Sequence, residues 1–195
     1  MKTPTDTLAV AADSAAVIGS LSRNADGLLI LGRYHAVHRN AAGEVLWEDD
    51  YDNLVTDAGA KLLLDTILGG SAFTATTYLG LKGTGAAAVG DTQLSHAGWS
   101  EVGLANAPAY TAPRKTVTWS AASGTGAGAR SKASSGSYIF AFTSGGTVDG
   151  SFLNLNGSAT IDSTTATLFS AGTFSGGSKV VAASDTLTVT YTLSV

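Results

Sequence analysis

The sequence has no cysteine, only three prolines and little charge. Without cysteine it can form no disulfide, thiolate metal site or iron–sulfur cluster, and it has no cysteine nucleophile. Charged residues make up 13% of the 195 residues, and the formal net charge of -4 does not favour polyanions, so no nucleic-acid partner is expected. No apolar run approaches the roughly 20 residues that span a bilayer, so no membrane partner is expected either.

Small residues and hydroxylated residues dominate what is present. Glycine, threonine and serine number 24, 25 and 21, about a third of the chain. The composition is not that of a disordered chain, because 44% of the residues are hydrophobic and the mean hydropathy is +0.19. Threonine-rich segments with scattered glycine predict short strands joined by tight turns.

The first 27 residues are predicted to form an extended N-terminal arm. Asp13 interrupts the one apolar stretch that resembles a secretory signal, so no signal peptide is expected. The small side chains of this segment bury little surface by themselves, so we expect the arm to become ordered on a partner. The candidate partner contacts in the arm are Leu8, Val10, Val17 and Ile18.

A hairpin and a helix are predicted next. Residues 28–38 and 44–51 flank a loop that contains Asn40 and Gly43, a pattern typical of a β-hairpin. Residues 56–68 then carry apolar side chains at helical spacing, with Thr56 or Asp57 as N-cap and Gly69 or Gly70 as the stop. The predicted apolar stripe consists of Ala60, Leu63, Leu64, Ile67 and Leu68.

Strand patterns fill the rest of the chain. The last one is the clearest, because four large apolar residues from Leu187 to Leu193 alternate with threonines. Asn156-Gly157 is typical of a type I′ hairpin turn, and residues 122–136 indicate a flexible loop. The predicted strands are 78–82, 99–104, 115–121, 137–143, 147–155, 159–162, 166–174 and 186–193. We therefore predict a mainly β fold, an antiparallel, jelly-roll-like β-sandwich with one short α-helix, formed by a single domain over residues 28–195.

Motifs for catalysis and for cofactors are missing or incomplete. The Gly-x-Ser-x-Gly elbow does not occur, and His35 and His38 are spaced to lie on opposite faces of a strand. The glycine-rich segments 83–85 and 124–128 lack the Lys-Ser/Thr ending of a phosphate-binding loop. We predict no catalytic residues, no metal and no cofactor. A glycosidase pair drawn from Glu44, Glu48 and Glu101 remains the enzymatic alternative.

An acidic run follows the hairpin turn. Glu48, Asp49, Asp50 and Asp52 lack the third oxygen ligand and the glycine of a calcium loop. A charged hairpin end is the simpler interpretation, and it fits docking on a basic surface. Asp49, Asp50 and Asp52 are therefore candidate partner contacts.

Tryptophans are candidates for sugar stacking. Trp47, Trp99 and Trp119 offer flat apolar faces, as in carbohydrate-binding modules. Trp119 alternates with Val117, however, which favours a place in the core.

Several segments after residue 52 resemble proteins of one class. They are NLVTDAGAKLLLDTI (53–67), YLGLKGTG (78–85), GDTQLSHAGWSE (90–101), RKTVTWSAAS (114–123) and the ending from Phe169 that contains DTLTVTYTLSV. In this order they resemble virion structural proteins of tailed bacteriophages, the small β-rich capsid cement, decoration and head- or tail-fibre proteins. The resemblance covers residues 52–195, and the first 51 residues have no counterpart.

The resemblance implies a non-enzymatic capsid cement or decoration protein. Its partners would be the major capsid protein and copies of itself. Its location would be the capsid surface of the virion, after synthesis in the host cytoplasm. The alternative is a tail-fibre or receptor-binding module that recognises a host surface glycan.

Overall fold

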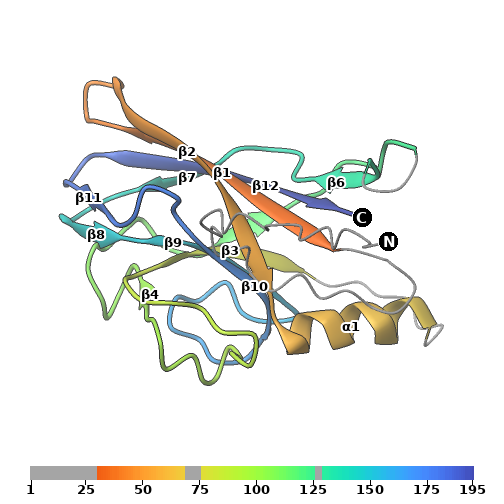
Figure 1. Cartoon of the computed structure of the whole chain (residues 1–195). Helices are drawn as coiled ribbons and strands as arrows, with labels where there is room; N and C mark the ends of the chain where they lie inside the picture. The colour runs from red at the N-terminus through yellow and green to blue at the C-terminus, as the bar shows by residue number, and fades with distance from the viewer. Residues whose placement is uncertain (1–29, 69–75, 126–128) are drawn as a thin grey trace, which may run out of the picture.

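The computed structural model describes residues 30–68, 76–125 and 129–195 (Figure 1). It confirms the predicted fold class: antiparallel strands form a sandwich-like curled sheet with one α-helix in the described residues. The predicted arm, with Leu8, Val10, Val17 and Ile18, lies outside the described residues. The elements are β1 (Leu31–Arg39), β2 (Val45–Val55), α1 (Asp57–Leu68), β3 (Thr77–Lys82), β4 (Glu101–Val102), β5 (Lys115–Val117), β6 (Ser131–Ala133), β7 (Tyr138–Ala141), β8 (Gly146–Val148), β9 (Gly150–Leu155), β10 (Thr167–Thr173), β11 (Lys179–Val181) and β12 (Thr186–Ser194).

Ten of the strands form two layers of one continuous sheet, and β8 and β11 form a separate two-stranded sheet. We call β1, β12, β6, β7 and the first part of β2 the β1 layer, and β9, β10, β3, β4 and β5 the β9 layer. The order is β4-β3-β9-β10-β2-β1-β12-β6, with β5 beside β3 and β7 beside β12. Strand β2 connects the layers, because residues 45–52 pair with β1 and residues 53–55 pair with β10. Figure 1 shows β2 running from the hairpin tip down to α1.

The alternating strand patterns explain the β1 layer. Leu187, Val189 and Tyr191 of β12 are buried, while the threonines between them are half-exposed on the other side. Strand β1 alternates in the same way, with Tyr34 and Ala36 buried. Because side chains of a strand point to alternate faces, this layer has one side in the core and one side outside.

Hydroxyl groups join the two layers inside the core. The Tyr51 hydroxyl donates to Ser151 Oγ of β9 at 2.8 Å, and the Tyr34 hydroxyl lies 3.1 Å from Ser170 Oγ of β10. Asn53 Nδ2 donates to the Tyr191 hydroxyl at 2.8 Å. These contacts satisfy the phenol groups, which would otherwise be costly to bury.

The helix begins where predicted but faces the sheet differently. Thr56 caps it, because its Oγ1 accepts the Gly59 N–H at 3.0 Å. Gly59 lies directly on the backbone of Phe169 in β10, so the buried side of α1 is centred on this glycine. Leu64 of the predicted apolar stripe is instead exposed. The side chains of Ile67 and Leu68 and the stop at Gly69 or Gly70 lie outside the described residues.

Other predictions about the strands need correction. The predicted strand 147–155 is two strands, because the chain breaks at Asp149 between β8, which pairs with β11, and β9, which pairs with β3 and β10. Residues 159–162 form turns, and an eleven-residue connection over 156–166 replaces the type I′ turn, although Asn156 does have a positive φ of 58°. Within the predicted loop 122–136, residues 131–133 form β6 against the end of β12.

The outer side of the β9 layer is covered. Loop residues 83–100 place Trp99 and Ala87 on Phe152, Leu168 and Ala171. Helix α1 packs on β10 beside this loop. In the part of the chain that the structure describes, no helix could span a membrane.

Candidate functional site

The outer side of the β1 layer forms a broad sheet face that we call the docking face. Its central rows are Leu46, Glu48, Asp50 and Asp52 on β2, Arg33, His35 and Val37 on β1, and Thr186, Thr188, Thr190 and Thr192 on β12. Ile139 of β7 lies opposite Thr188 and is 54% exposed. No element among the described residues packs over these rows, in contrast to the β9 layer.

Three carboxylates line one edge of the docking face. Glu48, Asp50 and Asp52 are exposed and point the same way, because they occupy alternate positions of β2. Asp50 Oδ1 lies 3.2 Å from His35 Nδ1 and 3.7 Å from Arg33 Nε. These pairs are exposed and weak, so the carboxylates remain accessible to a partner.

Asp49 does not belong to this row. It points to the other side of β2, where one carboxylate oxygen accepts the Ser175 N–H at 2.8 Å and the other accepts the Ser175 hydroxyl. Asp49 therefore fixes the turn after β10, and only two of the three predicted acidic contacts, Asp50 and Asp52, lie on the docking face. Glu48 takes the third place.

The two histidines of β1 separate as predicted. His35 is partly exposed on the docking face, and Glu48 Oε1 lies 3.8 Å from its Nε2. His38 is buried, with Nε2 2.9 Å from Asp185 Oδ2. Burial would raise the pKa of Asp185, but the Ala182 N–H and His38 outweigh it and hold that pKa below its ordinary value. His38 and Asp185 thus stabilise the turn between β11 and β12.

Glu101 is committed to a buried ion pair. Arg114 donates to it through Nε at 2.8 Å and through Nη2 at 2.6 Å, and the Asp162 N–H donates to the same carboxylate. Glu44 instead lies at the hairpin turn, where it accepts from Asn40, and Glu48 lies on the docking face. The structure therefore does not bring Glu101 together with Glu44 or Glu48.

A second buried pair joins Lys82 to Asp149. Lys82 Nζ lies 2.8 Å from Asp149 Oδ2 and also donates to the Gly83 and Gly85 carbonyls. Burial lowers the pKa of Lys82, opposed by the hydrogen bond and the charge of Asp149. Three acceptors around one ammonium indicate a structural pair. The same contacts explain the glycine-rich segment 83–85, because its carbonyls turn toward the Lys82 ammonium.

The tryptophans are packed rather than displayed. Trp99 is buried and donates through Nε1 to Asp91 Oδ2 at 2.9 Å. Trp119 packs against the core as predicted and donates to Thr77 Oγ1, while Trp47 is half-buried against Phe174. Trp99 is therefore enclosed, and Trp47 and Trp119 are partly buried against the core rather than displayed as sugar platforms.

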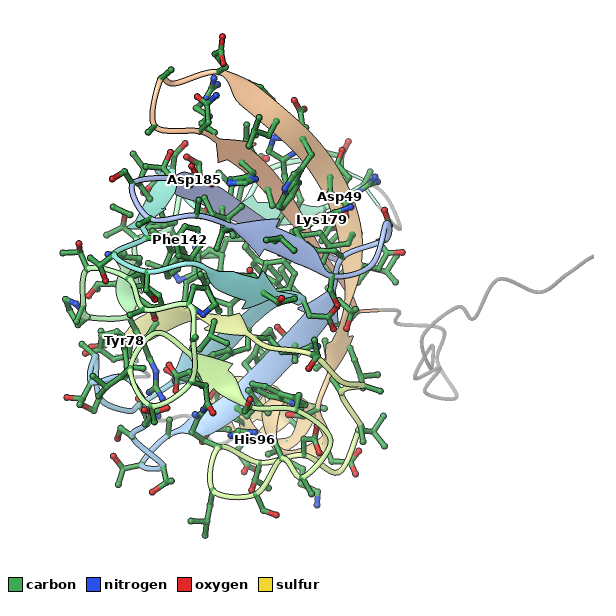
Figure 2. All side chains as sticks on the ribbon, turned by 90° about the vertical axis from the view of Figure 1, so that its left-hand side faces the viewer. Asp49, Tyr78, His96, Phe142, Lys179 and Asp185 are labelled. Atoms are coloured by element: carbon green, nitrogen blue, oxygen red, sulfur yellow. The ribbon has the colours of Figure 1, made fainter. Side chains whose placement is uncertain are left out.

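Sequence reasoning missed a hollow over the β9 layer. Its volume is about 460 Å³, and its walls come from residues 93–97 and 99–101, from Asn106 and from residues 162–164. Figure 2 shows His96, one of its lining residues, far from Asp49 and Asp185. No local pattern predicts it, because the hollow forms between segments about 60 residues apart in the sequence. The His-Ala-Gly-Trp segment (96–99) contributes three of its lining residues.

The chain matches no protein-family model, and no curated protein or solved structure shows significant similarity to it.

Proposed function

We propose that the chain is a non-enzymatic virion structural protein that attaches to the outside of an assembled phage capsid and stabilises it. Its partners would be the major capsid protein and further copies of itself, on the surface of the virion. The observation that carries the proposal is the docking face, a bare sheet face edged by Glu48, Asp50 and Asp52. The resemblance of residues 52–195 to phage virion proteins supports the same role.

The docking face has the features that a contact with a protein shell needs. A sheet whose other side is fixed in the core is rigid, so little conformational entropy is lost on binding. The carboxylate row attracts a basic surface and sets the orientation of the encounter. The threonines of β12 offer hydroxyls beside exposed Ile139 and Leu46, a mixture of polar and apolar groups that is typical of protein interfaces.

Charge removal tests the docking face. We expect the triple variant E48Q/D50N/D52N to attach more weakly to preformed capsids of the parent phage and to lose much of the salt dependence of attachment. Three exposed ion pairs of up to about 1 kcal/mol each correspond to a loss of up to about a hundredfold. Co-sedimentation with capsids at two salt concentrations measures both effects.

The matched control is Asp65→Asn. Asp65 is an exposed acid on α1, outside the docking face, so the same chemical change should leave attachment at the wild-type level. Equal attachment of the wild type and the triple variant at low salt would remove the carboxylate row from the proposal.

The predicted arm is tested by deletion. A chain without residues 1–25 should occupy fewer sites on preformed capsids, because the arm would lie along neighbouring subunits. Undiminished occupancy would exclude the arm from attachment.

The location on the particle decides between head and tail. Antibody labelling of purified virions, imaged by electron microscopy, should decorate the head over its whole surface. Labelling confined to the tail would favour the tail-fibre or receptor-binding alternative.

A further inference from the structure

The hollow over the β9 layer lies on the opposite side of the sandwich from the docking face. The loop that contains Trp99 covers the outer side of β9 and β10, and residues of that loop form one wall of the hollow. A protein attached through the docking face would therefore hold the hollow away from the surface to which it is bound. Such a position suits a second ligand.

The hollow presents hydrogen-bond acceptors. His96 Nδ1 lies 2.9 Å from the Trp99 carbonyl, so Nδ1 carries the proton of the neutral ring and Nε2 is an acceptor. Asp162 uses Oδ2 for the Ala105 N–H, and Asn106 uses Nδ2 for the Glu101 carbonyl. Among the described residues, His96 Nε2, Asp162 Oδ1 and Asn106 Oδ1 have no protein donor. A ligand with several donors would satisfy them.

The groups around the hollow argue against anionic ligands and against metal ions. Among the residues that the structure describes, no lysine or arginine lines it, and the nearby Arg114 uses its donors on Glu101, Ser158 and Ser163. Anionic groups would therefore find no cation. No group of three metal-ligating side chains occurs in the described residues, so the donor set does not suit a metal either.

Internal contacts hold the walls in place. The His96 ring stacks on Trp99 with centroids 4.1 Å apart, and Trp99 is anchored on Asp91. Asp162 has a left-handed φ of 64°, and its N–H is bonded to the buried Glu101. A wall that is fixed before binding loses little entropy when a ligand enters. Backbone held in this region is also found preferentially at ligand sites.

We propose that this hollow binds a neutral saccharide. Sugar hydroxyls donate to the three acceptors, while Ser95, Ser100 and Thr164 at the same hollow supply hydroxyls that donate in return. The 75% exposed Leu94 at its wall gives an apolar contact for the C–H face of a sugar ring. The volume lies within the range of small-molecule sites.

Saturation-transfer NMR on the free, full-length chain tests the proposal. The probes are glucose, galactose, mannose, rhamnose and N-acetylglucosamine, each at millimolar concentration. We expect transfer to at least one sugar, and the same sugar should shift the imidazole resonances of His96 and the side-chain amide of Asn106. No transfer to any sugar would overturn the proposal, and so would shifts confined to residues outside the hollow.

Two variants sharpen the test. His96→Phe keeps a ring on Trp99 but removes the nitrogen acceptor, and Asp162→Asn keeps the Ala105 contact but removes the charge. Each should lower the affinity for the sugar by about threefold to tenfold, which corresponds to the loss of one hydrogen bond. Asp65→Asn is the control and should bind as the wild type does.

The remaining outcomes are also decisive. Shift mapping on the wild type locates the bound sugar even where a variant fails to fold. Wild-type sugar affinity in both variants would contradict the proposal, and a response to the diamine putrescine without a response to any sugar would show a cation site instead. The proposal does not rest on capsid attachment, because the free chain is used throughout.

Discussion

The two layers of the sandwich differ in what lies on their outer sides. In the β9 layer, strand β9 is buried at all of its six positions, because the loop that contains Trp99 covers its outer side and the core covers its inner side. In the β1 layer, β1 and β12 alternate between buried and exposed positions, and the outer side is bare. Among the described residues, the first layer is covered on both sides, whereas the second has one bare side.

Charged residues follow the same division. Under the loops of the β9 layer, Glu101 and Arg114 pair with each other, as do Lys82 and Asp149, and all four are buried. On the docking face the ion pairs are exposed to solvent, and each is weak. Charge in the covered layer is thus paired and buried and stabilises the fold, while charge on the bare layer stays accessible to solvent.

Alkaline pH should have the largest effect on stability, because ionisation of the buried tyrosines would separate the two layers. Burial raises the pKa of Tyr34, Tyr51, Tyr110 and Tyr191 above the ordinary value of about 10. A raised pKa in the folded state means that stability is intact below pH 10 and falls as the unfolded chain loses protons above it. Four tyrosines at about 1.4 kcal/mol each would cost about 5 kcal/mol per pH unit.

Tyrosinate absorbance and circular dichroism, measured together, check this expectation. Ionisation of the buried tyrosines should coincide with loss of the strand signal in one cooperative step. Complete ionisation of all six tyrosines with an unchanged strand signal would contradict it.

Removing one arginine from each layer should destabilise the protein by different amounts. Arg114→Met leaves Glu101 buried and unpaired, which costs about 3–5 kcal/mol of unfolding free energy. Arg33→Met removes an exposed partner of Asp50 and should cost at most about 1 kcal/mol. Urea denaturation measures both.

A double variant serves as the control for the buried pair. Adding Glu101→Gln to Arg114→Met removes the stranded charge, so part of the lost stability should return. Equal losses for the two arginine variants would mean that the covered layer does not depend on its ion pair.

The turn that leads into β12 contains a buried acid, Asp185, and its removal should have an intermediate effect. Asp185→Asn keeps an acceptor for the Ala182 N–H but removes the charge that faces His38, at a cost of about 1–3 kcal/mol near pH 7. Since the pKa of Asp185 is lowered in the folded state, its contribution is present above the unfolded pKa of about 4 and disappears as pH falls through the folded value. In urea titrations, the unfolding free energies of the wild type and the variant should therefore differ at neutral pH and become equal at acidic pH. The same difference at both pH values would count against this role.

The docking face should contribute least to stability. The variant E48Q/D50N/D52N should unfold within about 1 kcal/mol of the wild type, because its charges are exposed. Thermal unfolding of the free chain checks this. A large loss would show that the row belongs to the fold, and the comparison between the two layers would then fail.

Local sequence patterns predicted the β1 layer well. Alternation in residues 186–193 and the three-residue spacing of His35 and His38 depend only on the geometry of one strand, and both were correct. The cap at Thr56 is local in the same sense. The outward direction of Asp50 and Asp52, and the inward direction of Asp49, also follow from strand alternation.

The covered layer was less predictable because its contacts join distant segments. The break at Asp149 depends on Lys82, which lies 67 residues earlier. The Arg114 pair and the hollow depend on loops that meet only after folding. The buried side of α1 was misjudged because a glycine, Gly59, decides where the helix touches β10, and a hydrophobic pattern does not weigh the absence of a side chain.

Strand β2 gives the molecule a mechanical property as well. It is one uninterrupted strand, bonded to β1 over its first part and to β10 over its last residues. Tension applied at the hairpin tip would pull β1 and β2 in the same direction and load the β1–β12 and β2–β10 ladders in shear, so their backbone bonds would have to yield together rather than one after another. A protein held on a surface through this hairpin would resist pulling through the length of β2.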